Sequence, residues 1–103
     1  MRRGVLVNHH NDLPTALKRA RQEFARQSHC RGFTAEEVHL NPGDIDPAQT
    51  TLDELPVVAN EDVPQGHLRL CTHELTIAEE MAVEKTVFTG QVEAARRGLG
   101  AAA

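Results

Sequence analysis

Aromatic residues are scarce in this chain of 103 residues, which contains no Trp, no Tyr and three Phe. The core must therefore be built from Leu, Val, Ile and Ala side chains together with Phe24, Phe33 and Phe88. Such a core is modest for one domain, and pairing with another chain is one way to bury more apolar surface. The scarcity also argues against nucleic-acid binding by stacking of bases on aromatic rings.

Cysteines and long apolar runs are also rare. Cys30 and Cys71 are too few for a disulfide scaffold. No run of apolar residues approaches the roughly 20 that span a bilayer. Residues 1–7, MRRGVLV, lack the longer apolar region and the small-residue cleavage site of a signal peptide. We therefore expect a cytoplasmic protein that does not enter a membrane.

Motifs of the common enzyme classes are missing from the sequence. It has no phosphate-binding loop, no dinucleotide-binding glycine pattern and no Gly-x-Ser-x-Gly nucleophile motif. Cys71 and His73 could pair as a thiolate and an imidazolium, but no glycine-rich elbow accompanies them. We therefore predict that the protein is not an enzyme.

The first third of the chain predicts one strand and one helix. Residues 3–8 contain three consecutive apolar residues, which is typical of a short buried strand. Asn11 or Asp12 can cap a helix that has Pro14 in its first turn and ends near Ser28. Apolar residues then recur at three- and four-residue spacing, which predicts one buried stripe. The stripe consists of Leu13, Ala16, Leu17, Ala20 and Phe24.

The middle of the chain predicts short elements separated by turns. Residues 38–40 alternate like a strand, and Asn41-Pro42-Gly43-Asp44 is a turn. Asp46-Pro47 resembles the start of a short helix that must stop before Pro56. Residues 56–59 and 67–71 both indicate strands, and we expect these two to pair as a hairpin.

A long helix is predicted from Thr76-Ile-Ala-Glu79, which has the form of a capping box, to about Arg97. Two apolar stripes run along it. We expect the first stripe to cover the sheet, and the second to meet the first helix or another copy of the chain. The first stripe comprises Ile77, Met81, Phe88, Val92 and Ala95, and the second comprises Val83, Val87 and Ala94.

These elements together predict an α+β fold. We expect a small, mainly antiparallel sheet, with the first amphipathic helix and the long C-terminal helix packed on one face. Its length suits one domain, spanning residues 1–98, and residues 99–103 are expected to form a frayed tail.

Charge is unevenly distributed along the sequence, whose net charge is −4. Residues 1–31 hold seven Lys or Arg and two acidic residues, whereas residues 32–85 hold twelve acidic residues and two basic ones. The simplest interpretation is that the basic helix docks on the acidic half of its own chain. An alternative is that Lys18, Arg19 and Arg26 bind an anionic polymer such as nucleic acid.

Two pairs of soft ligands suggest a second alternative. His29-Cys30 and Cys71-Thr-His73 supply the ligand types of tetrahedral zinc sites, although not the spacing of a zinc finger. The set closes only if the end of the first helix meets the end of strand 67–71. The alternative is therefore a zinc-binding protein that uses His29, Cys30, Cys71 and His73.

The leading hypothesis is a small accessory or regulatory protein that binds protein and needs no cofactor. We expect a homodimer that also contacts an unidentified protein partner, because a small core coexists with a helix carrying two apolar stripes. The candidate contacts are the second helical stripe and the acidic loop at residues 60–66. They comprise Val83, Val87, Ala94, Glu61 and Asp62.

Overall fold

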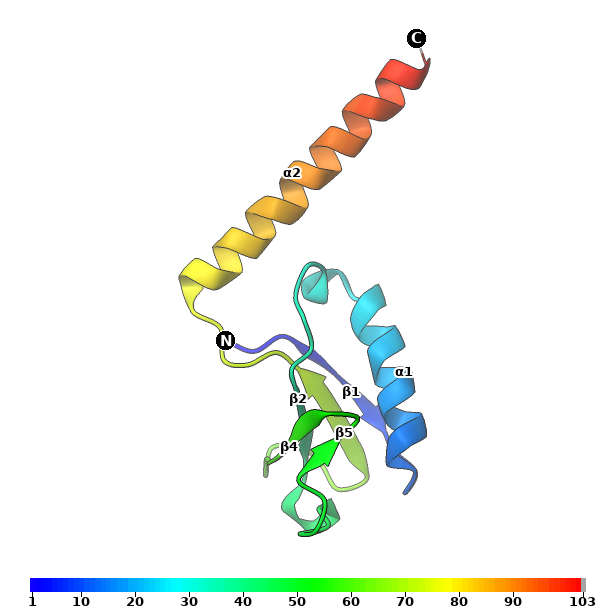
Figure 1. The fold of residues 1–103 in the computed structure, drawn as a ribbon, viewed down its shortest axis with the longest axis vertical. Helices are drawn as coiled ribbons and strands as arrows, with labels where there is room; N and C mark the ends of the chain where they lie inside the picture. The colour runs from blue at the N-terminus through cyan, green and yellow to red at the C-terminus, as the bar shows by residue number, and fades with distance from the viewer. Residues whose placement is uncertain (103) are drawn as a thin grey trace.

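Figure 1 shows a mixed sheet with one helix against it and a second helix that leaves it. The computed structural model describes the backbone of residues 1–102 and the side chains of residues 1–92. Its α+β class confirms the prediction. In chain order the elements are β1 (Gly4–Asn8), α1 (Leu13–Arg26), β2 (Glu37–Leu40), β3 (Thr51–Leu52), β4 (Leu55–Ala59), β5 (His67–Cys71) and α2 (Ile77–Ala102). Short 3-10 turns occupy Ser28–Cys30 and Pro42–Asp44.

The sheet has the strand order β1-β5-β2-β4-β3. β5 pairs antiparallel with β1 and β2, β2 pairs parallel with β4, and β3 pairs antiparallel with β4. The predicted hairpin of residues 56–59 with 67–71 is therefore wrong, because β2 lies between these strands. Leu40 pairs with Ala59 on one side and with Leu68 on the other. Val38 and Leu40 are almost fully buried, as expected of a strand with a neighbour on each side.

The predicted short helix after Asp46 is also wrong. The Asp46 carboxylate accepts a hydrogen bond from the Ala48 backbone N–H at 3.0 Å, which closes a turn of two residues. The chain then enters β3, where Thr51 pairs with Pro56. A local side-chain hydrogen bond therefore stabilises a turn in place of the first helical turn.

α1 forms as the sequence predicts. The Asp12 side chain accepts a hydrogen bond from the Thr15 N–H at 3.3 Å, and Pro14 lies in the first turn. The helix ends at Arg26, slightly before the predicted Ser28. Its apolar stripe packs on β1 and β5 and forms the core with the buried side chains of β2 and β5. The buried residues of α1 are Ala16, Leu17, Ala20 and Phe24.

α2 does not lie on the sheet, contrary to the expectation from its first stripe. Figure 1 shows it running away from the sheet, and the molecule measures 59 × 28 × 22 Å. Ile77, Met81 and Phe88 remain 77%, 64% and 66% exposed. The physical reason is that α1 already covers one apolar face of the sheet, while the opposite face carries polar side chains such as His39 and Glu37.

From the sequence we expected no membrane-spanning helix. None of the helices in the described part of the chain combines the length and apolar content needed to cross a bilayer.

Candidate functional site

The face of the sheet opposite α1 carries a buried polar cluster. Side chains alternate along each strand, so Val38 and Leu70 point to the α1 core while Glu37, His39 and Cys71 point to the other face. His39 is 3% exposed and Cys71 is fully buried, although α1 packs on the other face of the sheet and the described part of α2 runs away from it (Figure 1). Polar side chains therefore cover this face.

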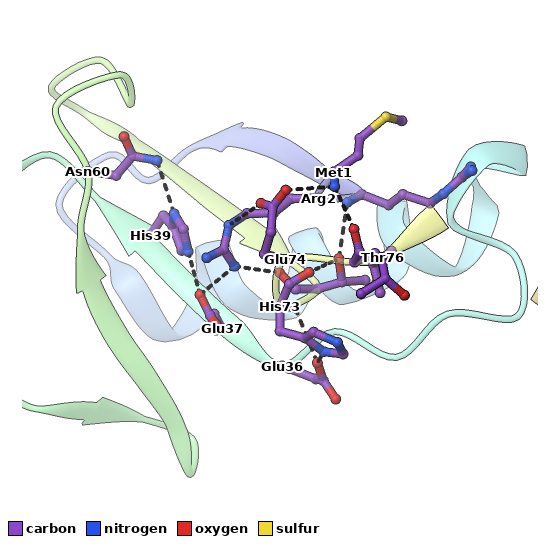
Figure 2. Close-up of polar contacts among 12 residues, drawn as sticks. Met1, Arg2, Glu36, Glu37, His39, Asn60, His73, Glu74 and Thr76 are labelled. Carbon is purple, nitrogen blue, oxygen red and sulfur yellow. Dashed lines mark hydrogen bonds and ion pairs between the residues drawn. The ribbon is translucent and has the colours of Figure 1, made fainter. Parts of the chain in front are cut away.

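Hydrogen bonds link the members of this cluster in a chain (Figure 2). The Asn60 Nδ2 lies 3.0 Å from His39 Nδ1, and His39 Nε2 lies 2.8 Å from Glu37 Oε1. Asn60 Oδ1 accepts from the Asp62 N–H at 2.9 Å, which fixes the amide so that Nδ2 donates to His39. His39 consequently holds its proton on Nε2 and donates it to Glu37.

Arg2 closes the other end of the cluster. Its Nη1 donates to Glu37 Oε1 at 2.8 Å and to the Thr72 carbonyl at 3.0 Å. Burial raises the pKa of the Cys71 thiol to about 11, so the thiol is protonated at neutral pH. A thiolate nucleophile is therefore not formed here without another cation. The donor atoms of Glu37, His39 and Cys71 all lie within 4.8 Å of one another.

The four residues of the predicted zinc set do not form a ligand group in the described part of the chain. Cys30 belongs to the core under α1, whereas Cys71 points to the opposite face of the sheet. His29 is exposed and its Nε2 lies 3.1 Å from the Gly4 carbonyl oxygen. His73 is exposed and pairs with Glu36. Of the four, the structure brings Cys71 into a ligand cluster with Glu37 and His39.

Glu37 and His39 were not among the residues predicted to form a site. Their spacing in Glu37-Val-His39 is the signal that could have found them, because residues i and i+2 of a strand share a face. The register that sets Glu37 directly opposite Cys71 depends on long-range strand pairing. The sequence alone offers no local signal for that pairing.

His73 joins the sheet to the start of α2. Its Nδ1 pairs with the Glu36 carboxylate, and its Nε2 lies 3.3 Å from Glu79 Oε2 (Figure 2 shows the Glu36 contact). Glu79 and Thr76 form the predicted capping box, since each backbone N–H donates to the side chain of the other. The hydrogen bonds to Glu36 and then to Glu79 raise the pKa of His73.

We expect the contacts of His73 with Glu36 and Glu79, which we call the His73 bridge, to depend on pH. The pKa of His73 is raised above its ordinary value of 6.5. The contribution of His73 to the stability of the folded state is therefore complete below pH 6.5 and is lost as pH rises through the folded-state pKa. The pKa values of Glu36 and Glu79 are lowered from their ordinary value of 4.5. Their contributions to the stability of the folded state are therefore present above pH 4.5 and are lost as pH falls through the folded-state pKa values. The bridge is therefore strongest between pH 4.5 and 6.5.

An NMR titration of the His73 ring measures this effect directly. The wild-type ring should titrate above 6.5, and Glu36→Gln should bring the midpoint down. Glu54→Gln, at an exposed position in the turn between β3 and β4, is the matched control and should leave the midpoint unchanged. Equal midpoints in wild type and Glu36→Gln would show that the bridge is absent in solution.

α2 presents one apolar face to solvent and another to its own chain. Ile77, Met81 and Phe88 are separated by four and seven residues and lie on one exposed face. Val83 and Val87 are half-buried and lie close to Gly32. Ala94 lies outside the residues whose side chains are described. The first stripe therefore does not pack on the sheet, and an interface at Val83, Val87 and Ala94 stays a prediction.

The other predicted contact residues lie on the surface. Lys18, Arg19 and Arg26 of α1 are exposed. Arg19 donates to the Asn8 carbonyl at 2.6 Å, and Arg26 pairs with a glutamate of its own helix at 3.3 Å. Glu61 and Asp62 are also exposed, in the turn that follows β4. Binding of an anionic polymer or of a protein at these positions stays a prediction.

Two surfaces of the described chain therefore stand out. One is the polar cluster on the sheet, and the other is the exposed face of α2, which we call the α2 apolar face and define as Ile77, Met81 and Phe88. Comparisons with protein-family models, with curated proteins and with solved structures find no match to this chain.

Proposed function

We propose that this protein is a non-enzymatic accessory or regulatory protein that acts by binding protein, and that α2 is its binding element. The proposal names a second copy of the chain as the first occupant of the α2 apolar face. A homodimer formed in this way leaves the acidic turn at Glu61 and Asp62 available to a further protein partner.

The observation that carries the proposal is the exposure of Phe88. It is one of three aromatic residues in the chain, and 66% of its surface is open to solvent. Burying a Phe side chain stabilises a protein by about 1.5–3 kcal/mol. In a protein with a small core, an exposed Phe leaves a large part of the available stabilisation unused. Met81 and Ile77, on the same face, add to the apolar area that association would remove from water.

A second copy suits this face because an antiparallel copy can place its own apolar residues against it. Apolar residues lie near both ends of the described part of the stripe, at Ile77 and at Phe88. Two antiparallel copies related by a two-fold axis near residues 82 and 83 bring Ile77 of each helix opposite Phe88 of the other, and Met81 opposite Glu84, whose charge is paired with Arg3. Such an arrangement buries the same patch on both chains, as symmetric dimers do.

From the sequence we predicted the contact on the other stripe of this helix. Val83 and Val87 already lie near Gly32 of their own chain, and Glu84 pairs with Arg3 at 2.5 Å. The two valine contacts hold one side of α2 against the body and turn the α2 apolar face away from it. Glu84 lies seven residues after Ile77 and four before Phe88, so its ion pair with Arg3 lies on the α2 apolar face itself. We therefore assign the self-contact to Ile77, Met81 and Phe88 in place of Val83 and Val87.

Phe88→Glu should convert a dimer into a monomer, because a carboxylate cannot be buried between two apolar stripes without a partner. Sedimentation equilibrium over a range of concentrations gives the masses, and the wild-type protein should approach twice the chain mass of 11.3 kDa. The variant should remain at one chain mass throughout.

Thr89→Glu is the matched control for this experiment. It adds the same charge at the next exposed position of α2, about 100° around the helix, and should leave the dimer intact. A monomeric wild-type protein, or equal loss of the dimer in both variants, would contradict the proposal. Loss of the dimer in Val87→Glu alone would return the interface to the second stripe.

A further inference from the structure

The polar cluster on the sheet has the geometry of a metal site held by two strands. Glu37 and His39 are two residues apart on β2, and Glu37 lies directly opposite Cys71 of β5. The side chains share one face, and their donor atoms lie within 4.8 Å of one another. Strands hold such donors more firmly than loops do, so the ligand arrangement is largely formed before an ion arrives.

We propose that Glu37, His39 and Cys71 together bind one thiophilic divalent cation, of which Zn²⁺ is the best example. Carboxylate oxygen, imidazole nitrogen and thiolate sulfur are all zinc ligands in proteins. Three protein ligands leave a fourth position on a tetrahedral ion for water or for a group from another molecule. This ligand set shares Cys71 with the one suggested by the sequence and replaces its other members.

Arg2 now supplies the positive charge that an ion would bring. Its guanidinium donates to Glu37 Oε1 at 2.8 Å (Figure 2). Arg2 precedes β1, and its side chain is 30% exposed, so it can withdraw toward solvent. Entry of the ion therefore exchanges one cation for another beside Glu37, and the carboxylate is not left unpaired in either state.

Binding of the ion in place of Arg2 requires one proton to leave Cys71 and one to move within His39. The thiol of Cys71 gives its proton to solvent when the sulfur bonds to the ion, and Glu37 is already a carboxylate paired with Arg2. His39 remains neutral, but its proton moves from Nε2 to Nδ1 so that Nε2 can ligate. With one imidazole, one carboxylate and one thiolate, the charge of a divalent ion is neutralised.

Asn60 opposes that tautomer, which makes it a positioning residue for the site. Its Nδ2 donates to His39 Nδ1 at 3.0 Å, whereas a ligating His39 needs an acceptor there. Asn60→Asp places a carboxylate oxygen at that position and keeps an acceptor for the Asp62 N–H. The variant should therefore bind the ion about tenfold more tightly, as a carboxylate behind a histidine ligand does.

Titration with Co²⁺ tests the proposal, because cobalt in a zinc site shows a near-ultraviolet charge-transfer band when a thiolate ligates it. Wild-type protein should develop the band with one equivalent of Co²⁺ and lose it when Zn²⁺ is added. Cys71→Ser should abolish the band. Cys30→Ser, which changes the other buried thiol on the α1 side of the sheet, should preserve it.

Three results would overturn the assignment. They are no band in the wild-type protein, a band that survives Cys71→Ser, and a band that disappears in Cys30→Ser while that variant is folded. Circular dichroism checks that each variant retains its helices. If Cys71→Ser does not fold, Asn60→Asp decides the question, because affinity equal to or weaker than wild type contradicts the role given to His39.

Discussion

Leu70→Ala is expected to lower the free energy of unfolding by about 2–5 kcal/mol. Leu70 is fully buried on β5 and lies in the core cluster with Phe24 and Cys30. Truncation removes the transfer free energy of the lost methyl groups and leaves a cavity that rigid neighbouring strands cannot close. Because domains of this size are stable by about 5–15 kcal/mol, the change removes a large part of the total.

Urea denaturation followed by circular dichroism measures this loss. The midpoint should fall while the slope, about 1–3 kcal/mol per molar urea, stays constant. Leu6→Ala is the matched control on β1, because Leu6 is 50% exposed, and it should change stability by about 0.5 kcal/mol or less. Equal losses in the two variants would show that the core does not lie between α1 and the sheet.

Local signals in the sequence predicted the elements of this fold better than their arrangement. The Asp12 cap, the stripe of α1 and the capping box of α2 depend on residues within one or two turns of each other, and they formed as predicted. The pairing of β4 with β2 instead of β5 joins segments far apart in the chain. Alternation of apolar residues shows that a strand exists but does not select its neighbour.

The candidate sites show the same limit. Cys71 was identified as a potential ligand because of its residue type, whereas Glu37 and His39 become its neighbours only through the register of β2 with β5. The two stripes of α2 were identified from their period. Which stripe faces the body depends on the place of Gly32, which periodicity within the helix does not encode.

Gly32→Ala should detach the first turns of α2 from the body. Gly32 has φ +83°, a conformation that costs a residue with a side chain about 1–2 kcal/mol. A Cβ at this position would also lie 2.7 Å from Val87 Cγ2 and 2.9 Å from Val83 Cγ1, which is too close for carbon atoms. Valine is stiff about its first torsion, so the overlap is relieved by movement of α2.

Gly66→Ala separates backbone strain from this overlap. Gly66 has φ +84°, so an alanine there carries the same strain, but nothing lies within 4 Å of the added Cβ. Urea denaturation should therefore show a similar loss of about 1–2 kcal/mol from strain in both variants. Hydrogen exchange at residues 83–87 should accelerate in Gly32→Ala alone, because only that variant loses the contact with α2.

The effect of Gly32→Ala on association follows from the same geometry. The α2 apolar face points outward because Val83 and Val87 lie against Gly32 on another side of the helix. Released from that contact, α2 exposes Val83 and Val87 in addition to Ile77, Met81 and Phe88, and sedimentation should report association at least as strong as in wild type. Weaker association in Gly32→Ala than in Gly66→Ala would show that the dimer needs the body of the protein as well as α2.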